Sequence, residues 1–273
     1  MLYYLLFCLG FVSPVTGLGY YVDRSCVPYT ATFDIALSEA MKMAEDAVTR
    51  LGSGTDTDFE RVMERIFSFQ KTDSASLKKV MVEQTKRKAD VRIYCDNDLV
   101  KALGNAGRWE PRPNRLKGFV DNKNHLVPDE DGLGCLLPKV LGVTYDTPSE
   151  KVSKHLAGRS TITICDYAFT KPVLLKDVAG KQLENLDGGI TTLSNILSFV
   201  ILHELTHMPS CKALDQKIGD KKGTLAYGWA KSIALPTEKA IFNSDNYAFL
   251  GTFAWLAEPI LGKPSFPGKP QSP

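Results

Sequence analysis

Residues Thr191 to Met208 read TTLSNILSFVILHELTHM and combine a long apolar run with the pattern HELTH near its end. The apolar side chains fall on nearly every side of a helix, so we expect this helix to be buried at the centre of the fold. At about 3.6 residues per turn, His203 and His207 lie one turn apart on one face, with Glu204 beside them.

The pattern HExxH is typical of a metal site. The chain has only four histidines, and two of them stand here. Two neutral imidazoles can hold one metal ion, an open position can hold water, and a glutamate can take the proton of that water. The alternative is a chance pair of core histidines, but two histidines and a glutamate in a buried turn are costly without compensation. The pattern predicts His203 and His207 as metal ligands, Glu204 as general base and Zn2+ as the cofactor.

The remaining chain predicts a mixture of helices and strands. Apolar residues at three- and four-residue steps predict helices over residues 33–51, 57–67 and 74–88, the second with a capping box formed by Thr57 and Glu60. Alternating residues predict strands over residues 91–95 and 161–165. We expect an α+β, mainly helical fold with a small sheet packed on the HExxH helix. The cleft should lie between that sheet and the segment after His207.

The chain divides into four parts by composition. Residues 1–17 are an apolar stretch followed by small residues, which is typical of a secretory signal peptide. A membrane anchor is the alternative, although the stretch is short for a span. Residues 18–160 form an N-terminal helical and mixed region, residues 161–261 the metal-binding region, and residues 262–273 a flexible tail rich in Pro and Gly. No later segment looks able to cross a bilayer, so we expect a secreted protein with no membrane contact after signal cleavage.

Charge and cysteine content fit this expectation. The formal net charge is +2, with no basic cluster of the kind that binds nucleic acid. After signal cleavage five cysteines remain, which allows at most two disulfides and leaves one thiol, and the spacing does not fix the pairing. A zinc-cysteine cluster is the alternative, but the sequence has no CxxC. The five cysteines are Cys26, Cys95, Cys135, Cys165 and Cys211.

Four short motifs follow one another in the C-terminal region: TITIC before Asp-Tyr-Ala-Phe, then HELTH, then GTLAYG, then NSDNYA in a terminal helix. Their order resembles the deuterolysin-type aspzincins, a largely fungal family of secreted zinc metallopeptidases. The resemblance covers residues 161–258. It implies a zincin-like fold, zinc ligands at His203 and His207, a general base at Glu204, and Tyr227 as the hydroxyl that stabilises the oxyanion. The alternative for Tyr227 is a tyrosine of the core.

The third metal ligand departs from that family. Its members read GTxDxxYG and use this aspartate as a ligand, whereas this chain reads GTLAYG from Gly223 to Gly228. Alignment on Tyr227 places Thr224 at the ligand position, and a neutral hydroxyl is a poor ligand for zinc. Another acid can substitute: Asp220 is the first candidate, followed by Asp215. Weaker candidates are Asp245, which more simply caps the last helix, and the distant His125 and His155.

Two functions remain open on the sequence. The first is a secreted zinc endopeptidase, in which Glu204 assists the attack of zinc-bound water on peptide bonds of a protein or peptide substrate. The second is a catalytically inactive aspzincin-like secreted protein that binds zinc or an extracellular protein. An intact Glu204 favours the enzyme, and the missing family aspartate favours the binding protein.

Overall fold

A five-stranded sheet forms the frame of the molecule. The computed structural model describes residues 18–53, 56–67, 81–83, 89–101, 107–112, 118–124, 126, 133–146, 159–170, 172–178, 189–208, 211, 213–219 and 223–257. In order across the sheet, the strands are β2 (Met81–Glu83), β1 (Leu18–Val22), β3 (Val91–Tyr94), β7 (Ser160–Ile164) and β6 (Gly142–Asp146). Neighbours are parallel except for β6, which runs antiparallel to β7 and forms one edge.

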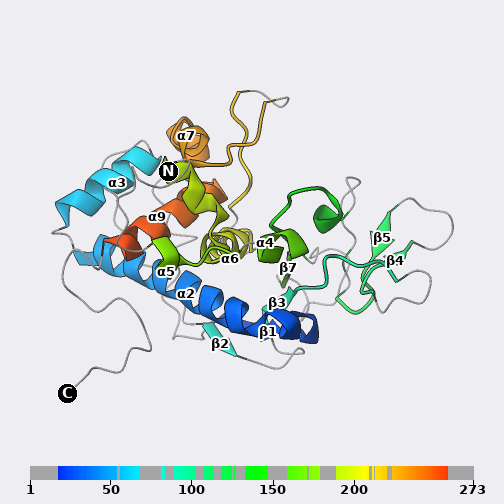
Figure 1. Cartoon of the computed structure of the whole chain (residues 1–273). Helices are drawn as coiled ribbons and strands as arrows, with labels where there is room; N and C mark the ends of the chain where they lie inside the picture. The colour runs from blue at the N-terminus through cyan, green and yellow to red at the C-terminus, as the bar shows by residue number, and fades with distance from the viewer. Residues whose placement is uncertain are drawn as a thin grey trace, which may run out of the picture.

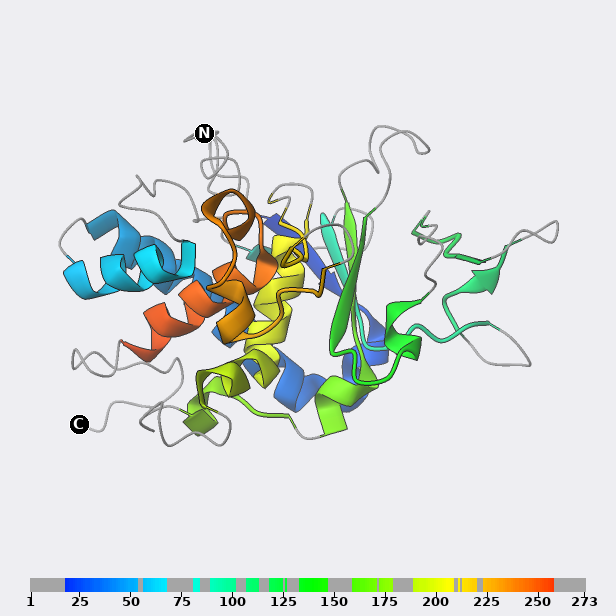
Figure 2. The same ribbon diagram turned by 90° about the horizontal axis from the view of Figure 1, so that it is seen from above.

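Helices cover one face of this sheet, while the short antiparallel ribbon of β4 and β5 lies on its other side (Figure 2). The remaining elements are η1 (Arg24–Tyr29), α2 (Thr30–Ser53), α3 (Thr57–Phe67), β4 (Glu110–Pro111), β5 (Phe119–Val120), η2 (Gly134–Leu136), α4 (Asp166–Thr170), α5 (Leu175–Val178), η4 (Gly189–Asn195), α6 (Leu197–Thr206), α7 (Trp229–Ser232), α8 (Thr237–Ala240) and α9 (Ser244–Leu256).

Helix α6 lies at the centre of the fold (Figure 1). It carries the HExxH pattern and contacts α2, α9 and β6. Every residue from Leu197 to Thr206 is buried, which confirms the expectation of a central helix. The long helix α2 and the C-terminal helix α9 supply much of the core around it, through side chains such as Phe33, Met43 and Phe249.

The first two helix predictions are confirmed, as are the strands β3 and β7. The capping box at Thr57 is wrong, because Asp56 supplies the cap: its Oδ1 accepts from the N–H of Phe59 at 3.0 Å. The helix predicted over residues 74–88 is wrong where the structure describes it. Met81–Glu83 is a strand because it pairs with β1, and this long-range pairing overrides the local helical pattern.

Two disulfides tie loops to the sheet. Cys26 in η1 bonds Cys95 at the end of β3, and Cys135 in η2 bonds Cys165 at the end of β7. This confirms the expected maximum of two bonds, and of the cysteines that the structure describes, Cys211 takes part in neither. Among the described residues, no helix combines the length and the apolar character needed to cross a membrane.

The edge strand β6 is held from the side that faces away from α6. Tyr145 packs with Trp109, Leu126 and Leu133 in a small second core. Its hydroxyl donates to Asp98 Oδ2 at 2.6 Å and accepts from the N–H of Gly134 at 2.9 Å. The position of β6 is therefore fixed independently of the helix that carries the HExxH pattern.

Candidate metal centre

Helix α6 presents three polar side chains at its C-terminal end: His203, Glu204 and His207. Helical spacing places the two imidazoles side by side, with 3.1 Å between their Nε2 atoms. The chain then turns away, and the N–H of Ala213 bonds back to the carbonyl of Thr206 at 3.2 Å.

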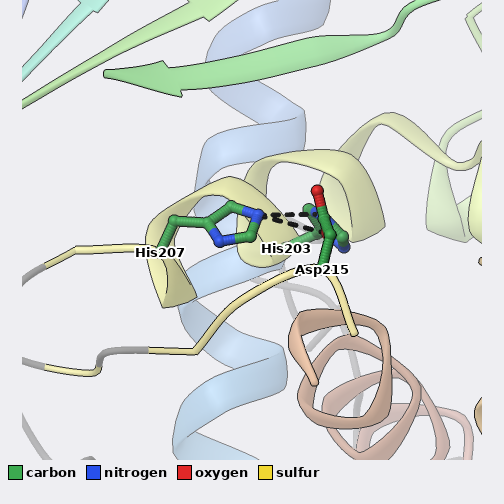
Figure 3. Close-up of side chains that lie close together, drawn as sticks. All are labelled: His203, His207 and Asp215. Atoms are coloured by element: carbon green, nitrogen blue, oxygen red, sulfur yellow. Dashed lines mark hydrogen bonds and ion pairs between the residues drawn. The ribbon is translucent and has the colours of Figure 1, made fainter. Parts of the chain in front are cut away.

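Asp215 joins the two histidines from the loop after α6. Its Oδ1 lies 3.2 Å from Nε2 of His203 and 3.5 Å from Nε2 of His207. Figure 3 shows the three side chains converging on one point. The loop is held against the start of α9, since the N–H of Leu214 donates to the carbonyl of Phe242 at 2.7 Å and the N–H of Ser244 donates to the carbonyl of Leu214 at 3.2 Å.

Each of these three side chains is oriented by a partner behind it. His203 Nδ1 lies 2.7 Å from Asp245 Oδ1, and His207 Nδ1 lies 3.0 Å from the carbonyl oxygen of Ala213. Asp215 Oδ2 accepts from the hydroxyl of Tyr227 at 2.6 Å. Such outer partners fix the tautomer and orientation of metal ligands in known sites.

The geometry of the group fits a zinc ion. Because a carboxylate and a carbonyl oxygen accept from Nδ1, the hydrogen of each neutral ring is on Nδ1, and both Nε2 atoms carry lone pairs. Asp215 Oδ1 is buried, and no donor among the described residues points at it. Three electron-rich atoms thus face one another at 3.1, 3.2 and 3.5 Å. Ligands about 2.0–2.1 Å from a tetrahedral zinc lie about 3.3 Å apart.

The electrostatics of the group also favour a cation. Burial alone would lower the pKa of His203, but the adjacent carboxylates of Asp215 and Asp245 outweigh burial and raise it. The pKa of His207 is likewise raised against burial, by Asp215 and Glu204. Burial opposes ionisation of Asp215, yet the two imidazoles hold its pKa well below its usual range. The site therefore stabilises positive charge between these side chains.

Glu204 lies between the histidines and the edge strand β6. Thr144 Oγ1 is 2.7 Å from Glu204 Oε2 and 3.0 Å from the main-chain carbonyl oxygen of the same residue. Burial raises the pKa of Glu204, although the nearby His203 and His207 act in the opposite direction. A buried carboxyl with a raised pKa is suited to general acid-base work near neutral pH.

A cavity of about 590 Å³ opens over the group. One wall is β6, from Gly142 to Asp146, and the opposite wall is Leu214, Asp215 and Tyr227. This is the cleft expected between the sheet and the segment after His207. Among the described residues, those that line it include acids but no lysine or arginine, and its size is within the range of small-molecule sites.

Tyr227 lines the cavity, and its hydroxyl donates to Asp215 Oδ2. Partial burial and the neighbouring Asp215 carboxylate raise the pKa of Tyr227, so the phenol remains a donor. In this arrangement Tyr227 orients the acid that meets the two histidines.

The candidates for the third ligand separate in the structure. Asp215, the second candidate on the sequence, lies in the group, whereas Asp220, His125 and His155 lie outside the described residues. The N-cap prediction for Asp245 is wrong: Asn243 takes the N-cap position, and Asp245 contacts His203 instead. A sequence signal for Asp215 existed, because it is the first acid after His207.

Comparison with known proteins neither supports nor contradicts the resemblance to aspzincins. No family model matches the sequence, and no curated protein matches it.

Proposed function

We propose that this chain is a secreted zinc endopeptidase of the deuterolysin type, in which Asp215 takes the place of the family's aspartate ligand. The observation that carries the proposal is the meeting of His203 Nε2, His207 Nε2 and Asp215 Oδ1 beside a buried glutamate in one cavity. Catalytic zinc sites use three protein ligands and keep a further position open. Asp215 therefore answers the main argument against catalysis, which was the missing third ligand.

Each polar side chain then has a chemical task. Bound zinc would supply Lewis acidity to a water molecule and to the carbonyl oxygen of a peptide bond. Glu204 would accept a proton from the attacking water and return it to the leaving amine. Asp245 and the carbonyl of Ala213 hold the two imidazoles so that Nε2 faces the ion. Tyr227 orients Asp215 through its hydroxyl. To stabilise the oxyanion, as the resemblance implies, this hydroxyl would have to leave Asp215 and donate to the substrate oxygen.

An extended peptide is the substrate that this cavity suits best. The strand β6 lines it and is an edge of the sheet. An edge strand can pair with an added strand through main-chain hydrogen bonds. A peptide bound in this way would pass directly over Glu204, with its carbonyl group near the two histidines.

The fold and the compartment belong to the same proposal. A mixed sheet with an antiparallel edge strand over the HExxH helix agrees with a zincin-like architecture. Two disulfides agree with an oxidising compartment and with residues 1–17 acting as a signal peptide. We propose that the mature chain binds neither nucleic acid nor membranes.

Zinc content and peptidase activity of matched variants test the proposal. The secreted chain should hold one zinc and digest casein. Asp215→Asn should lose zinc on dialysis, whereas Asp220→Asn should keep it. Glu204→Gln should keep zinc and lose activity by about 100-fold or more, which is the usual contribution of general acid-base catalysis.

Two results would contradict this assignment. Loss of zinc in Asp220→Asn but not in Asp215→Asn would move the third ligand to the first candidate of the sequence. Zinc binding without digestion of casein or of a peptide library would leave the alternative function, a secreted protein that binds zinc or an extracellular partner without catalysis.

A further inference from the structure

The edge strand β6 lies directly against the side chain of Glu204, the proposed general base. Gly142, Thr144 and the next residue but one, Asp146, share one face of the strand because side chains alternate. At Gly142 a Cβ would come within 2.9 Å of both Cγ and Oε1 of Glu204. A glycine at this position therefore lets the strand approach the carboxyl group directly.

Thr144 is bonded to Glu204 at two points. Its Oγ1 lies 2.7 Å from Oε2 and 3.0 Å from the main-chain carbonyl oxygen. A hydroxyl has one proton and two acceptor lone pairs. The Thr144 hydroxyl can therefore donate either to the carboxylate oxygen Oε2 or to the main-chain carbonyl oxygen of Glu204, and both acceptors lie within hydrogen-bond distance.

We propose that Thr144 is a positioning residue for Glu204, and that the Thr144 hydroxyl holds the Glu204 carboxyl group in one orientation beside the two histidines. The inference rests on the proposed function. Its basis is the placement of Thr144 by structure that does not involve Glu204: β6 pairs with β7 along its length, and Tyr145, the next residue, is bonded to Asp98. The hydroxyl is thus preorganised, and one carboxylate oxygen is committed to it while the other is left for water.

The test compares variants that differ in one hydroxyl group. Thr144→Val keeps the branched shape and removes the hydroxyl, whereas Thr144→Ser keeps the hydroxyl. We expect Thr144→Val to lower kcat by about 10- to 100-fold, as for other outer contacts of metal sites, with KM and zinc content unchanged. Thr144→Ser should stay within about threefold of the wild type, because serine differs mainly in its freer side-chain rotation.

Thr161→Val is a matched control in the same sheet. Thr161 lies on the neighbouring strand β7, opposite Tyr145, and its buried hydroxyl has no hydrogen-bond partner in the described part of the chain. Its removal should leave kcat unchanged. If Thr144→Val folds poorly, Thr144→Ala and Thr144→Ser replace that comparison, since these two also differ by a hydroxyl group alone.

The outcomes distinguish a failure of the Thr144 role from a failure of the proposed function. A wild-type kcat in Thr144→Val, an equal loss in Thr144→Ser, or loss of zinc with the hydroxyl would each overturn the positioning role. If the wild-type chain itself digests nothing, or if Glu204→Gln is as active as the wild type, the proposed function fails and the role of Thr144 fails with it.

Discussion

Asp245 is a buried carboxylate that serves two donors from distant parts of the chain. Its Oδ1 lies 2.7 Å from Nδ1 of His203, and its Oδ2 accepts from the N–H of Gly228 at 2.6 Å. It stands in the first turn of α9, so the helix N-terminus also stabilises its charge. One residue thereby sets the ring orientation of His203 and the path of the turn that leads to Tyr227.

Asp245→Asn should weaken zinc binding. An amide has one oxygen and one NH2 group, so it cannot accept from both His203 and Gly228, and one contact becomes a clash of donors. We expect the Kd for zinc to rise by about 10- to 100-fold, measured by competition with a chelator of known affinity. Asp34→Asn, at an exposed position of α2, is the matched control. Equal zinc affinity in the two variants would remove Asp245 from the site.

Gly142→Ala should impair catalysis more than folding. The new Cβ would press on Cγ and Oε1 of Glu204 at 2.9 Å, so either the carboxyl group or the strand must shift. Gly134→Ala is the steric control, because its Cβ would meet the Val143 side chain of the same strand at 2.9 Å. Thermal unfolding should show similar losses for both variants, with the larger fall in kcat for Gly142→Ala. A similar kcat in both would mean that the approach to Glu204 is unimportant.

Among the elements, α3 depends on a capping side chain that also bridges two helices. Asp56 Oδ1 accepts from the N–H of Phe59, and its Oδ2 lies 2.7 Å from Nε of Arg50 in the last turns of α2. A single carboxylate thus begins α3 and fixes its angle to α2. The buried face of α3, with Phe59, Met63 and Ile66, then packs on the core.

Asp56→Ala should destabilise the fold by about 1–2 kcal/mol near neutral pH, which is typical of a lost cap. The hydrogen bond from Arg50 lowers the pKa of Asp56 in the folded protein. A lowered folded pKa stabilises the protein above the unfolded value of about 3.9, and this contribution is lost as the pH falls through the folded value. The difference in urea-unfolding free energy between wild type and variant should therefore shrink in acid.

Asp58→Ala is the control for this measurement, because Asp58 is exposed and pairs only with an exposed Arg61 at 3.3 Å in the described structure. It should change the unfolding free energy by less than about 0.5 kcal/mol. If Asp58→Ala cost as much as Asp56→Ala, helix charge rather than the cap would explain the effect.

At the scale of the whole molecule, the group of His203, His207 and Asp215 joins α6 to the loop that follows it. His203 lies in α6 and His207 caps its C-terminus, while Asp215 belongs to a loop held on the start of α9. Zinc bound to the folded state alone would stabilise it through mass action. The unfolded chain presents these ligands at uncorrelated positions, so the ion should favour the folded form strongly.

Removal of zinc by a chelator should lower the Tm. With free zinc about 1,000-fold above Kd, the stabilisation is about 4 kcal/mol, which corresponds to about 10 °C for a domain of this size. Readdition of zinc should restore the Tm of the wild type but not that of Asp215→Asn. Identical melting of the wild type with and without zinc would exclude a tightly held ion in this group.

Local patterns predicted the helices α2, α3 and α6 and the strands β3 and β7, because the spacing of neighbouring apolar residues indicates each of them. The strand β6 was not predicted: Val143, Thr144 and Tyr145 favour a strand, but the run is short and bounded by Gly142 and Asp146, and its pairing with β7 fixes it. The strand β1 was not predicted either, and β2 was mistaken for helix. The strands β1 and β2 pair with each other across a long stretch of sequence, and β6 is fixed by its pairing with the following strand β7.

The pairing of His203 with His207, and Glu204 beside them, followed from the helical repeat alone, because four residues make about one turn. Asp215, Asp245 and Thr144 reach the same site only through the packing of α9 and β6 against α6. Their places depend on loop closure and sheet edge position, which are set by contacts between distant segments. The chain thus encodes the HExxH pattern locally, whereas tertiary contacts decide which acid joins the two histidines and which residues surround Glu204.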